Sequence, residues 1–405
     1  MLVLPSHAQQ TPPAGEEPTR AAAITAEATN KSQHLAPTAS SRGEELFLKV
    51  ERRAIDPVFN PSGLNLKLGG LPTGGGFSLG PRYTRNDLFH DTLTSDTSVV
   101  GSTKLWWRGE TALIAPSAAH GHLSFRLDAA YENAASVQYF GEGPVTTKDG
   151  KSNFRREFTT THFETGVHTF HDRFIFGYRI GGLLVNIGPG RQTDPPSTDK
   201  LYTEQNTPGL DQQSNFLTGS SFGTLDFTKR GFRDPSGFRF QVQNTQFWDK
   251  TRNAYSFDRL STQGEYYFTF ANGMRTLALR ARNETSFTSG TNLVPFYLQP
   301  TIGGSDDLRG YDRYRFYGNG SSVVNVEYRW PLAQVIDLAL FVDGGNVYDR
   351  PGLIGIRHTR GNAGIGARLK NKDTTFMRFD IGASPEGVQI WFVFNPVFGS
   401  LSHSY

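Results

Sequence analysis

The stretch VVNVEYRW, residues Val323–Trp330, alternates apolar and polar side chains along most of its length. From Val324 onward its even-numbered residues are valine, tyrosine and tryptophan, whereas Asn325, Glu327 and Arg329 are polar or charged. Because successive side chains of a β-strand point to opposite faces, this period of two predicts a strand with one apolar and one charged face.

The same alternation recurs along the chain from about Gly63 onward. Most of the segments are longer than the five or six residues that are usual for strands of soluble proteins. Counting them gives sixteen predicted strands, at residues 63–71, 75–85, 97–107, 108–115, 121–140, 155–171, 173–188, 216–229, 238–249, 256–270, 275–288, 321–331, 337–348, 359–370, 374–384 and 386–398.

Alternation alone does not distinguish a soluble sandwich from a membrane barrel, but two further features do. Aromatic residues gather near strand ends, as at Trp106-Trp107 and Tyr139-Phe140, where a transmembrane barrel carries its aromatic girdles. Connections alternate between short turns, such as Ala271–Gly273, and long loops, such as Gly188–Asn215 and Gly290–Gly320. The sequence therefore predicts an all-β fold, a sixteen-stranded antiparallel transmembrane β-barrel closed without a free edge.

Composition narrows the classes of function. Cysteine is absent, which excludes disulfides, thiol catalysis and thiolate metal sites. The net charge is only +3, and no basic cluster is interleaved with aromatic residues, so we expect no nucleic-acid partner. A mean hydropathy of −0.44 is compatible with a membrane barrel, because only alternate residues face lipid.

The ends of the chain differ from its centre. Residues 1–8 resemble the last part of a secretory signal with a cleavage point after Ala8, and residues 9–62 lack periodicity and are predicted to be a linker. We assign residues 63–398 to the barrel, with Phe398 as a terminal aromatic residue of the last strand, and residues 399–405 to an extension.

Two motifs flank the opening stretch. Gly303-Gly304-Ser305 and Arg309-Gly310-Tyr311 lie in the long segment before it, and Phe341-Val342-Asp343-Gly344-Gly345 follows it. Parity places Glu327 on the charged face of its strand, and Asp343 has the same relation to the apolar residues around it. A guanidinium group bonded to two carboxylates could hold a long loop in place with charge-assisted hydrogen bonds.

These motifs resemble those of the BamA/TamA superfamily of bacterial surface-antigen barrels. The resemblance implies that the sixth external loop folds into the barrel and that the loop arginine contacts an acid on each of the next two strands. We call the implied residues the loop lock; they are Arg309, Gly310, Tyr311, Glu327, Asp343 and Gly345.

The resemblance also implies a location in the bacterial outer membrane and a role in inserting outer-membrane proteins or translocating polypeptides. In this family the seam between the first and last strands is thought to open sideways. Here Gly69, Gly70 and Pro396 should weaken that seam, because glycine destabilises a strand and proline removes a hydrogen-bond donor. The implied partners are outer-membrane lipids, unfolded outer-membrane protein clients and a separate periplasmic subunit.

The segment before the first predicted strand is too short for the periplasmic POTRA modules of the family, so we expect the chain to lack them. This departure leaves an alternative function, a passive porin or structural surface antigen that keeps the fold.

No pattern indicates an enzyme, a cofactor or a metal. His162, His168 and His171 lie near one hairpin without a consistent acid partner, and Asp306-Asp307 lacks the further oxygen ligands of a calcium site. We therefore expect no catalytic residues and no cofactor.

Overall fold

The computed structural model describes residues 62–394 and 398, apart from residues 73, 230, 232–233, 351–357 and 372–373. The predicted signal remnant, the predicted linker up to residue 61, Pro396 and the predicted extension 399–405 lie outside the described residues. Within the described part of the chain, no helix is long and apolar enough to span a membrane.

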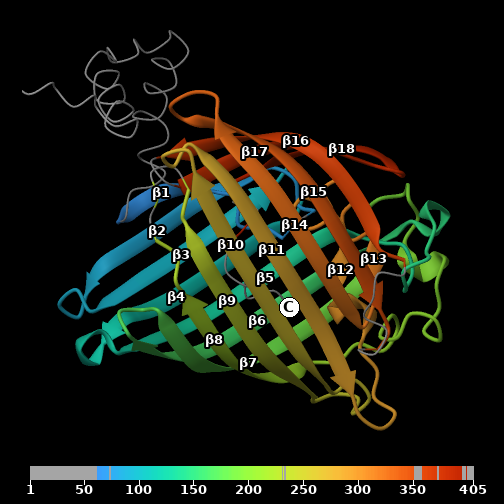
Figure 1. Cartoon of the computed structure of the whole chain (residues 1–405). Coiled ribbons are helices and arrows are strands. Elements are labelled where there is room, and N and C mark those ends of the chain that lie inside the picture. The colour runs from blue at the N-terminus through green and yellow to red at the C-terminus, as the bar shows by residue number, and fades with distance from the viewer. Residues whose placement is uncertain are drawn as a thin grey trace, which may run out of the picture. The chain divides into compact units, whose positions relative to one another are not determined.

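One sixteen-stranded antiparallel sheet contains all the long strands, and each of them pairs with its neighbours along the chain (Figure 1). The strands are β1 (Gly63–Leu68), β2 (Ser78–Leu88), β3 (Leu93–Ser102), β4 (Trp107–Ala118), β5 (Leu123–Tyr139), β6 (Ser152–Thr169), β7 (Phe174–Pro189), β8 (Phe216–Asp226), β9 (Gly237–Asp249), β10 (Phe257–Phe270), β11 (Arg275–Thr288), β14 (Gly320–Pro331), β15 (Ile336–Tyr348), β16 (Arg360–Asn371), β17 (Thr374–Ser384) and β18 (Gly387–Val393).

The remaining elements are short. Strands β12 (Thr301–Ile302) and β13 (Phe316–Tyr317) pair with each other inside the segment between β11 and β14. Single 3-10 turns occur in the connections: η2 (Ala119–Gly121), η3 (Lys148–Gly150), η4 (Thr198–Lys200) and η5 (Phe296–Leu298). The predicted all-β class and the sixteen-stranded antiparallel sheet are thus confirmed.

Several predicted strand boundaries were wrong, among them those of the first, third and last strands. The third strand was placed at 97–107, but β3 spans Leu93–Ser102 and a turn with a left-handed residue, Leu105, precedes β4. The first strand ends at Leu68, and the two residues after it, Gly69 and Gly70, have positive φ angles of 75° and 91°, outside the extended region.

The last strand was placed at 386–398 but ends at Val393. Phe398 is buried instead against Tyr267 and Ala278, with ring centroids of Phe398 and Tyr267 5.9 Å apart. The Arg329 guanidinium also lies 5.1 Å from the Phe398 ring. Packing against these polar-face residues of β10, β11 and β14, rather than strand pairing, therefore places this aromatic residue.

The two faces of the sheet are inverted relative to a soluble protein. Val324, Leu340 and Val342 are 52%, 48% and 58% exposed, whereas the intervening Glu327 and Asp343 are at most 1% exposed. We call the exposed face of the sheet, which is apolar, the bare face; the opposite face, whose side chains are buried, is charged. This arrangement suits a surface in contact with lipid, with the polar groups satisfied inside the protein.

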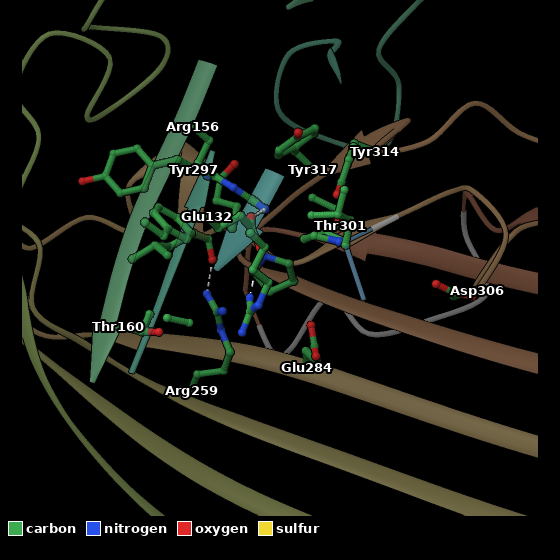
Figure 2. Close-up of a pocket in the computed structure, with 18 of the residues that line it drawn as sticks. Glu132, Arg156, Thr160, Arg259, Glu284, Tyr297, Thr301, Asp306, Tyr314 and Tyr317 are labelled. Atoms are coloured by element: carbon green, nitrogen blue, oxygen red, sulfur yellow. Dashed lines mark hydrogen bonds and ion pairs between the residues drawn. The ribbon is translucent and has the colours of Figure 1, made fainter. Parts of the chain in front are cut away.

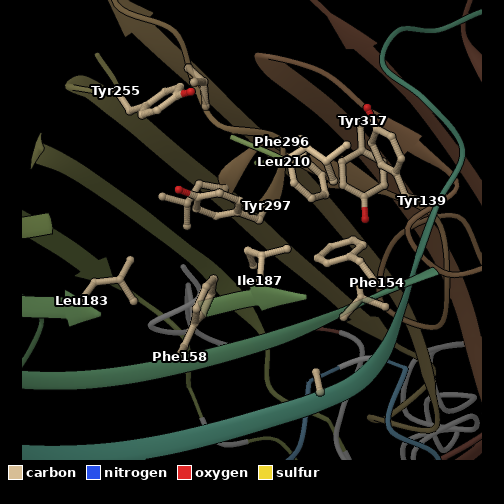
Figure 3. Close-up of a cluster of buried hydrophobic side chains, with 14 of the residues drawn as sticks. Tyr139, Phe154, Phe158, Leu183, Ile187, Leu210, Tyr255, Phe296, Tyr297 and Tyr317 are labelled. Carbon is tan, nitrogen blue, oxygen red and sulfur yellow. The ribbon is translucent and has the colours of Figure 1, made fainter. Parts of the chain in front are cut away.

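Aromatic side chains of the segment between β11 and β14 pack against aromatic side chains of β5 and β6 (Figure 3). The Phe296 ring of η5 lies 5.3 Å from Tyr139 of β5 and 4.8 Å from Phe154 of β6. Tyr317 of β13 lies 4.8 Å from Tyr139 on edge-to-face geometry. The segment between β11 and β14 is therefore packed against β5 and β6 as well as against its own neighbours.

The two ends of the sheet approach each other without a ladder. Among the described residues, β1 and β18 share no backbone pairing. A Cβ atom at Gly69 would nevertheless lie 3.6 Å from the Cβ of Phe394, and the Phe77 and Phe394 rings are 5.5 Å apart. The residues that directly follow β1 and β18 thus approach each other near Phe394.

Candidate functional site: the segment between β11 and β14

The segment 289–319, which we call the insertion, turns back onto the charged face of the sheet. Gly303 and Gly304 have positive φ angles of 116° and 103°, which other residues rarely adopt. A side chain at Gly303 would also overlap the Asp312 carbonyl oxygen. These glycines therefore allow the sharp reversal that carries residues 305–311 to β14–β17.

Arg309 is the centre of this contact, with no exposed surface. Its Nη2 and Nε donate to the two carboxylate oxygens of Asp343, at 2.7 and 3.0 Å, and its Nη1 donates to Glu327 Oε2 at 2.7 Å. The guanidinium lies 3.5 Å from the centroid of the Phe341 ring. Burial alone would lower the pKa of Arg309, but Asp343 and Glu327 outweigh it and raise the pKa above its usual value.

Glu327 is shared among three arginines. Arg329 Nε donates to its Oε1 at 2.7 Å, and Arg368 of β16 donates to both oxygens, at 2.9 and 2.7 Å. Arg368 also reaches Asp380 of β17 at 2.6 Å. The charges of four strands and the insertion therefore form one continuous buried network.

Asp343 has a different environment. Arg309 is its one ion-pair partner among the described residues, and its other donors are the neutral amides of Asn325 and Asn362, at 2.7 and 2.8 Å, and the Arg309 main-chain N–H at 3.2 Å. Asn325 Nδ2 also donates to the Asp307 carbonyl at 2.8 Å. Asp343 thus binds both the side chain and the backbone of the insertion.

Small residues let the insertion approach the sheet closely. A Cβ at Gly310 would lie 2.6 Å from Asn362 Cβ, and one at Gly382 would overlap the Arg309 carbonyl. A Cβ at Gly345 would lie 2.9 Å from the Ser322 carbonyl oxygen and 3.3 Å from a methyl carbon of Leu308. Tyr311 donates through its hydroxyl to the Gly361 carbonyl at 3.2 Å.

The insertion also holds the final hairpin, β17–β18. Trp391 Nε1 donates to the Arg309 carbonyl at 2.6 Å, and Ser384 Oγ donates to the Gly310 carbonyl at 2.7 Å. Arg315, which is 1% exposed, donates to both carboxylate oxygens of Glu386, at 2.8 and 2.9 Å. The last strand is therefore bound to the insertion as well as to β17.

A cavity of about 560 Å³ remains on the charged face between the insertion and strands β4–β6, β10 and β11. Figure 2 shows Arg156, Glu132 and Arg259 among the residues that line it, together with Tyr314 and Tyr317 of the insertion. Arg156 pairs with Glu132 at 3.1 Å. Arg259, by contrast, donates to neutral oxygens, Ser286 Oγ at 3.2 Å and the Leu298 carbonyl.

The histidines and aspartates that we considered and rejected as metal ligands have other partners. His162 Nδ1 lies 3.1 Å from Asp128, and His168 lies between Asp172 and Ser124 at 2.9 and 2.8 Å. Asp306 pairs with Arg378 and Asp307 with Arg282, at 2.5 and 2.8 Å. No group of three or more potential metal ligands occurs within the described ranges.

The structure brings all six predicted loop-lock residues together, and it adds residues that we did not predict, among them Arg368, Asp380, Gly382 and Trp391. A partial signal existed, because Arg378 and Asp380 alternate with apolar residues in the predicted strand 374–384. Their contact with Arg368 and the insertion depends on the register between strands, which a single segment does not specify.

The family model of the Omp85 superfamily domain matches residues 123–384. No curated protein matches the sequence significantly. Among solved structures, BamA from Haemophilus ducreyi lacking POTRA domains 1-3 is similar with a TM-score of 0.60 and 12% identity, over 90% of this chain and 80% of that one.

CdiB from Escherichia coli is similar with a TM-score of 0.55 and 12% identity, over 81% of this chain and 62% of that chain. CdiB from Acinetobacter baumannii gives a TM-score of 0.47 at 12% identity, over 81% of this chain and 57% of that chain. At these identities the likeness concerns the fold. The chain spans less than two thirds of either CdiB chain.

Proposed function

The chain belongs to the Omp85 superfamily, and from this membership we propose that it is an outer-membrane barrel that assists the insertion of outer-membrane proteins or translocates polypeptides. In this proposal the sheet closes between β1 and β18, the insertion lies in the lumen, and client strands pass through the seam. The observation that carries the proposal is the buried contact of Arg309 with Glu327 and Asp343.

Closure is supported by the inverted faces of the sheet and by the approach of its two ends. The bare face is apolar along its strands, and an open edge in lipid would leave unpaired backbone groups at high cost. Gly69 and Phe77 already contact Phe394 at the far end of the sheet.

The seam is the proposed lateral gate. Backbone ladders join all fifteen neighbouring strand pairs of the large sheet, while none joins β1 to β18 among the described residues. Gly69 and Gly70, which we predicted to weaken the gate, lie directly after β1. The third predicted gate residue, Pro396, lies outside the described part of the chain.

A passive porin is less well supported. Residues of the insertion such as Tyr297, Tyr314 and Tyr317 line the cavity on the charged face and fill much of the space that a wide channel needs. The buried ion pairs of Arg309 hold that segment in place. A partner subunit that delivers clients, and the clients themselves, remain part of the proposal.

A disulfide across the seam tests the proposal. Cysteines at Gly69 and Phe394 would have their Cβ atoms about 3.6 Å apart, within the disulfide range, and the chain has no native cysteine to interfere. We expect the oxidised Gly69→Cys/Phe394→Cys protein to lose insertion of a model barrel client into liposomes, and reduction to restore it.

The matched control joins two strands that are already paired. Val326 and Val342 are directly opposed on β14 and β15, so a disulfide there closes no new seam. Full insertion activity in both the oxidised seam variant and the oxidised control would contradict the lateral gate. Activity lost in both would indicate general damage from oxidation, and the gate would then lack support.

We also propose that the protein is not an enzyme, and one arrangement allows a test. His168 lies 2.8 Å from Ser124 Oγ and 2.9 Å from Asp172, the order of a serine hydrolase triad. The Asp172 side chain is 71% exposed, so water weakens its hold on the imidazole. We expect no labelling of Ser124 by a fluorophosphonate probe; labelling that Ser124→Ala abolishes would overturn this proposal.

A further inference from the structure

A second hollow lies on the opposite face of the sheet, away from the insertion. This groove, of about 630 Å³, forms where β2, β3 and β4 end beside the longer β5 and β6. Four apolar residues wall one side of it and are 41–63% exposed, namely Phe77, Leu79, Leu105 and Trp107. We call them the apolar wall.

The groove lies where the bare face changes from apolar to polar. Strand register places four outward side chains in one row across β4 to β7: Trp107, Asn133, Glu157 and Asn186. On β7 the outward residue two positions before Asn186 is the exposed Leu184. On β5 the outward residue two positions before Asn133 is Tyr131, whose ring lies 4.8 Å from the Trp107 ring. The outward side chains therefore change from apolar to polar near this row, as expected close to a membrane interface.

Two arginines, Arg155 and Arg191, lie at the polar side of the groove, and few negative groups balance their charge. The Arg155 Nε is buried without a hydrogen-bond partner, and the Arg155 Nη1 lies 3.5 Å from Glu157. That carboxylate already accepts hydrogen bonds from Asn133, at 2.7 Å, and from Asn186. Arg191 has no ion pair among the described residues.

The backbone also leaves room for these guanidinium groups. A Cβ at Gly188 would lie 3.0 Å from Arg155 Nη2, so glycine here permits the observed position of the arginine. The main-chain N–H of Arg191 donates to the Ala135 carbonyl at 3.1 Å, which fixes its backbone beside β5. Two cations and one engaged carboxylate give the groove an excess of positive charge.

We propose that this groove binds a membrane lipid with a phosphomonoester headgroup. Arg155 and Arg191 hold the phosphate, because guanidinium groups bind phosphate with strong, geometrically matched hydrogen bonds. An acyl chain lies along the apolar wall and continues onto the apolar face below. The inference rests on the proposed membrane location but not on the proposed insertion activity.

Native mass spectrometry of the full chain released from nanodiscs tests this inference. The discs contain phosphatidylcholine with a small fraction of phosphatidic acid, which carries the phosphomonoester. We expect the wild-type protein to retain phosphatidic acid in preference to phosphatidylcholine. Arg155→Gln and Arg191→Gln should each weaken that retention about tenfold, the change expected for one lost charge-assisted hydrogen bond.

Arg85→Gln is the matched control, because Arg85 is an outlying arginine on β2 with a side chain that is 52% exposed. It should retain phosphatidic acid like the wild type. Leu105→Ser should weaken retention of phosphatidic acid without changing its dependence on the two arginines. Full displacement of the lipid by an equal concentration of inorganic phosphate would show a phosphate site and overturn the lipid proposal.

The failure of this inference differs from that of the proposed function. Equal retention by the wild type, Arg155→Gln and Arg191→Gln, with all three proteins floating with liposomes, would overturn the lipid site alone. Failure of the wild type to float with liposomes would overturn the membrane location itself. Unchanged migration of folded and heated samples on gels would show that the variants fold.

Discussion

At the scale of single residues, the two carboxylates around Arg309 are not equivalent. Glu327 keeps Arg329 and Arg368 if Arg309 is removed, since both lie within 2.9 Å of it. Asp343 would keep only amide and backbone donors. A buried carboxylate without a cation is costly, so the stabilisation that Arg309 provides falls mainly on its pair with Asp343.

We therefore expect Arg309→Ala to lower the free energy of unfolding by about 3–5 kcal/mol, the range for breaking a buried ion pair. In double-mutant cycles, the coupling of Arg309 with Asp343, probed by Asp343→Asn, should exceed its coupling with Glu327, probed by Glu327→Gln. Urea unfolding in lipid vesicles measures both. Arg85→Ala, at an exposed site, should leave the free energy of unfolding close to that of the wild type. Equal couplings would contradict the asymmetry.

Glu204 gives a prediction about pH. Burial opposes its ionisation, but the N–H groups of Gly209 and Asp211 and the Tyr255 hydroxyl donate to it, each at 2.7–2.8 Å, and lower its pKa. A lowered folded pKa means that the stabilisation is present above the unfolded value, near 4.5, and is lost as the pH falls through the folded pKa.

We expect residues 204–211 to exchange amide hydrogens faster at acid pH than at pH 7, after correction for intrinsic rates. Glu204→Gln should remove most of that pH dependence, because glutamine does not titrate. Hydrogen exchange with mass spectrometry reports on this segment directly. The same pH dependence in the wild type and Glu204→Gln would exclude Glu204 as its cause.

At the scale of elements, the final hairpin depends on the insertion. Strand β18 has a ladder on one side only, with β17, and its free side faces β1 without pairing among the described residues. Contacts with the insertion add to this single ladder. Trp391 donates to the Arg309 carbonyl, and its ring lies 4.6 Å from the Arg313 guanidinium. Movement of the insertion should therefore be transmitted to β18.

Trp391→Phe separates these two contacts, since phenylalanine keeps a ring for Arg313 but lacks the N–H donor. We expect amide exchange in β18 to accelerate about tenfold, as for the loss of one buried hydrogen bond. The control is Trp330→Phe, because the Trp330 ring stacks on Tyr328 on the apolar face, 5.5 Å away. Unchanged exchange in β18 would show that the ladder with β17 suffices.

At the scale of the whole molecule, the insertion decides whether the proposed barrel conducts. It forms ion pairs with β14, β15 and β17 and reaches β5 and β6 through Phe296 and Tyr317. Contacts of the insertion with both sets of strands border a cavity of about 560 Å³. The intact protein should therefore conduct ions poorly.

Planar bilayer recordings check this expectation. We expect small or rare openings from the wild type, and a several-fold larger conductance when residues 304–312 are replaced by a glycine-serine linker of equal length. Arg309→Ala should give intermediate behaviour with frequent openings, because the insertion is then held less tightly. Large and steady openings from the intact protein would favour the passive porin.

The sequence by itself determined the strands and their faces. A period of two is a local property of each segment, so Glu327 and Asp343 could be placed on the charged face before their neighbours were known. Family motifs then added Arg309 as their partner. The turn near Leu105 and the end of the last strand were misplaced, because backbone angles and packing at strand ends are weakly encoded by alternation.

Only the tertiary structure decided which charges share the network and how the ends of the sheet meet. Arg368 and Asp380 join Glu327 through the register of β14 to β17, and Trp391 reaches Arg309 across 82 positions of sequence. The lipid groove likewise depends on a row of residues from four strands. Such contacts follow from register and sheet curvature, which belong to many segments at once and cannot be read from any single one.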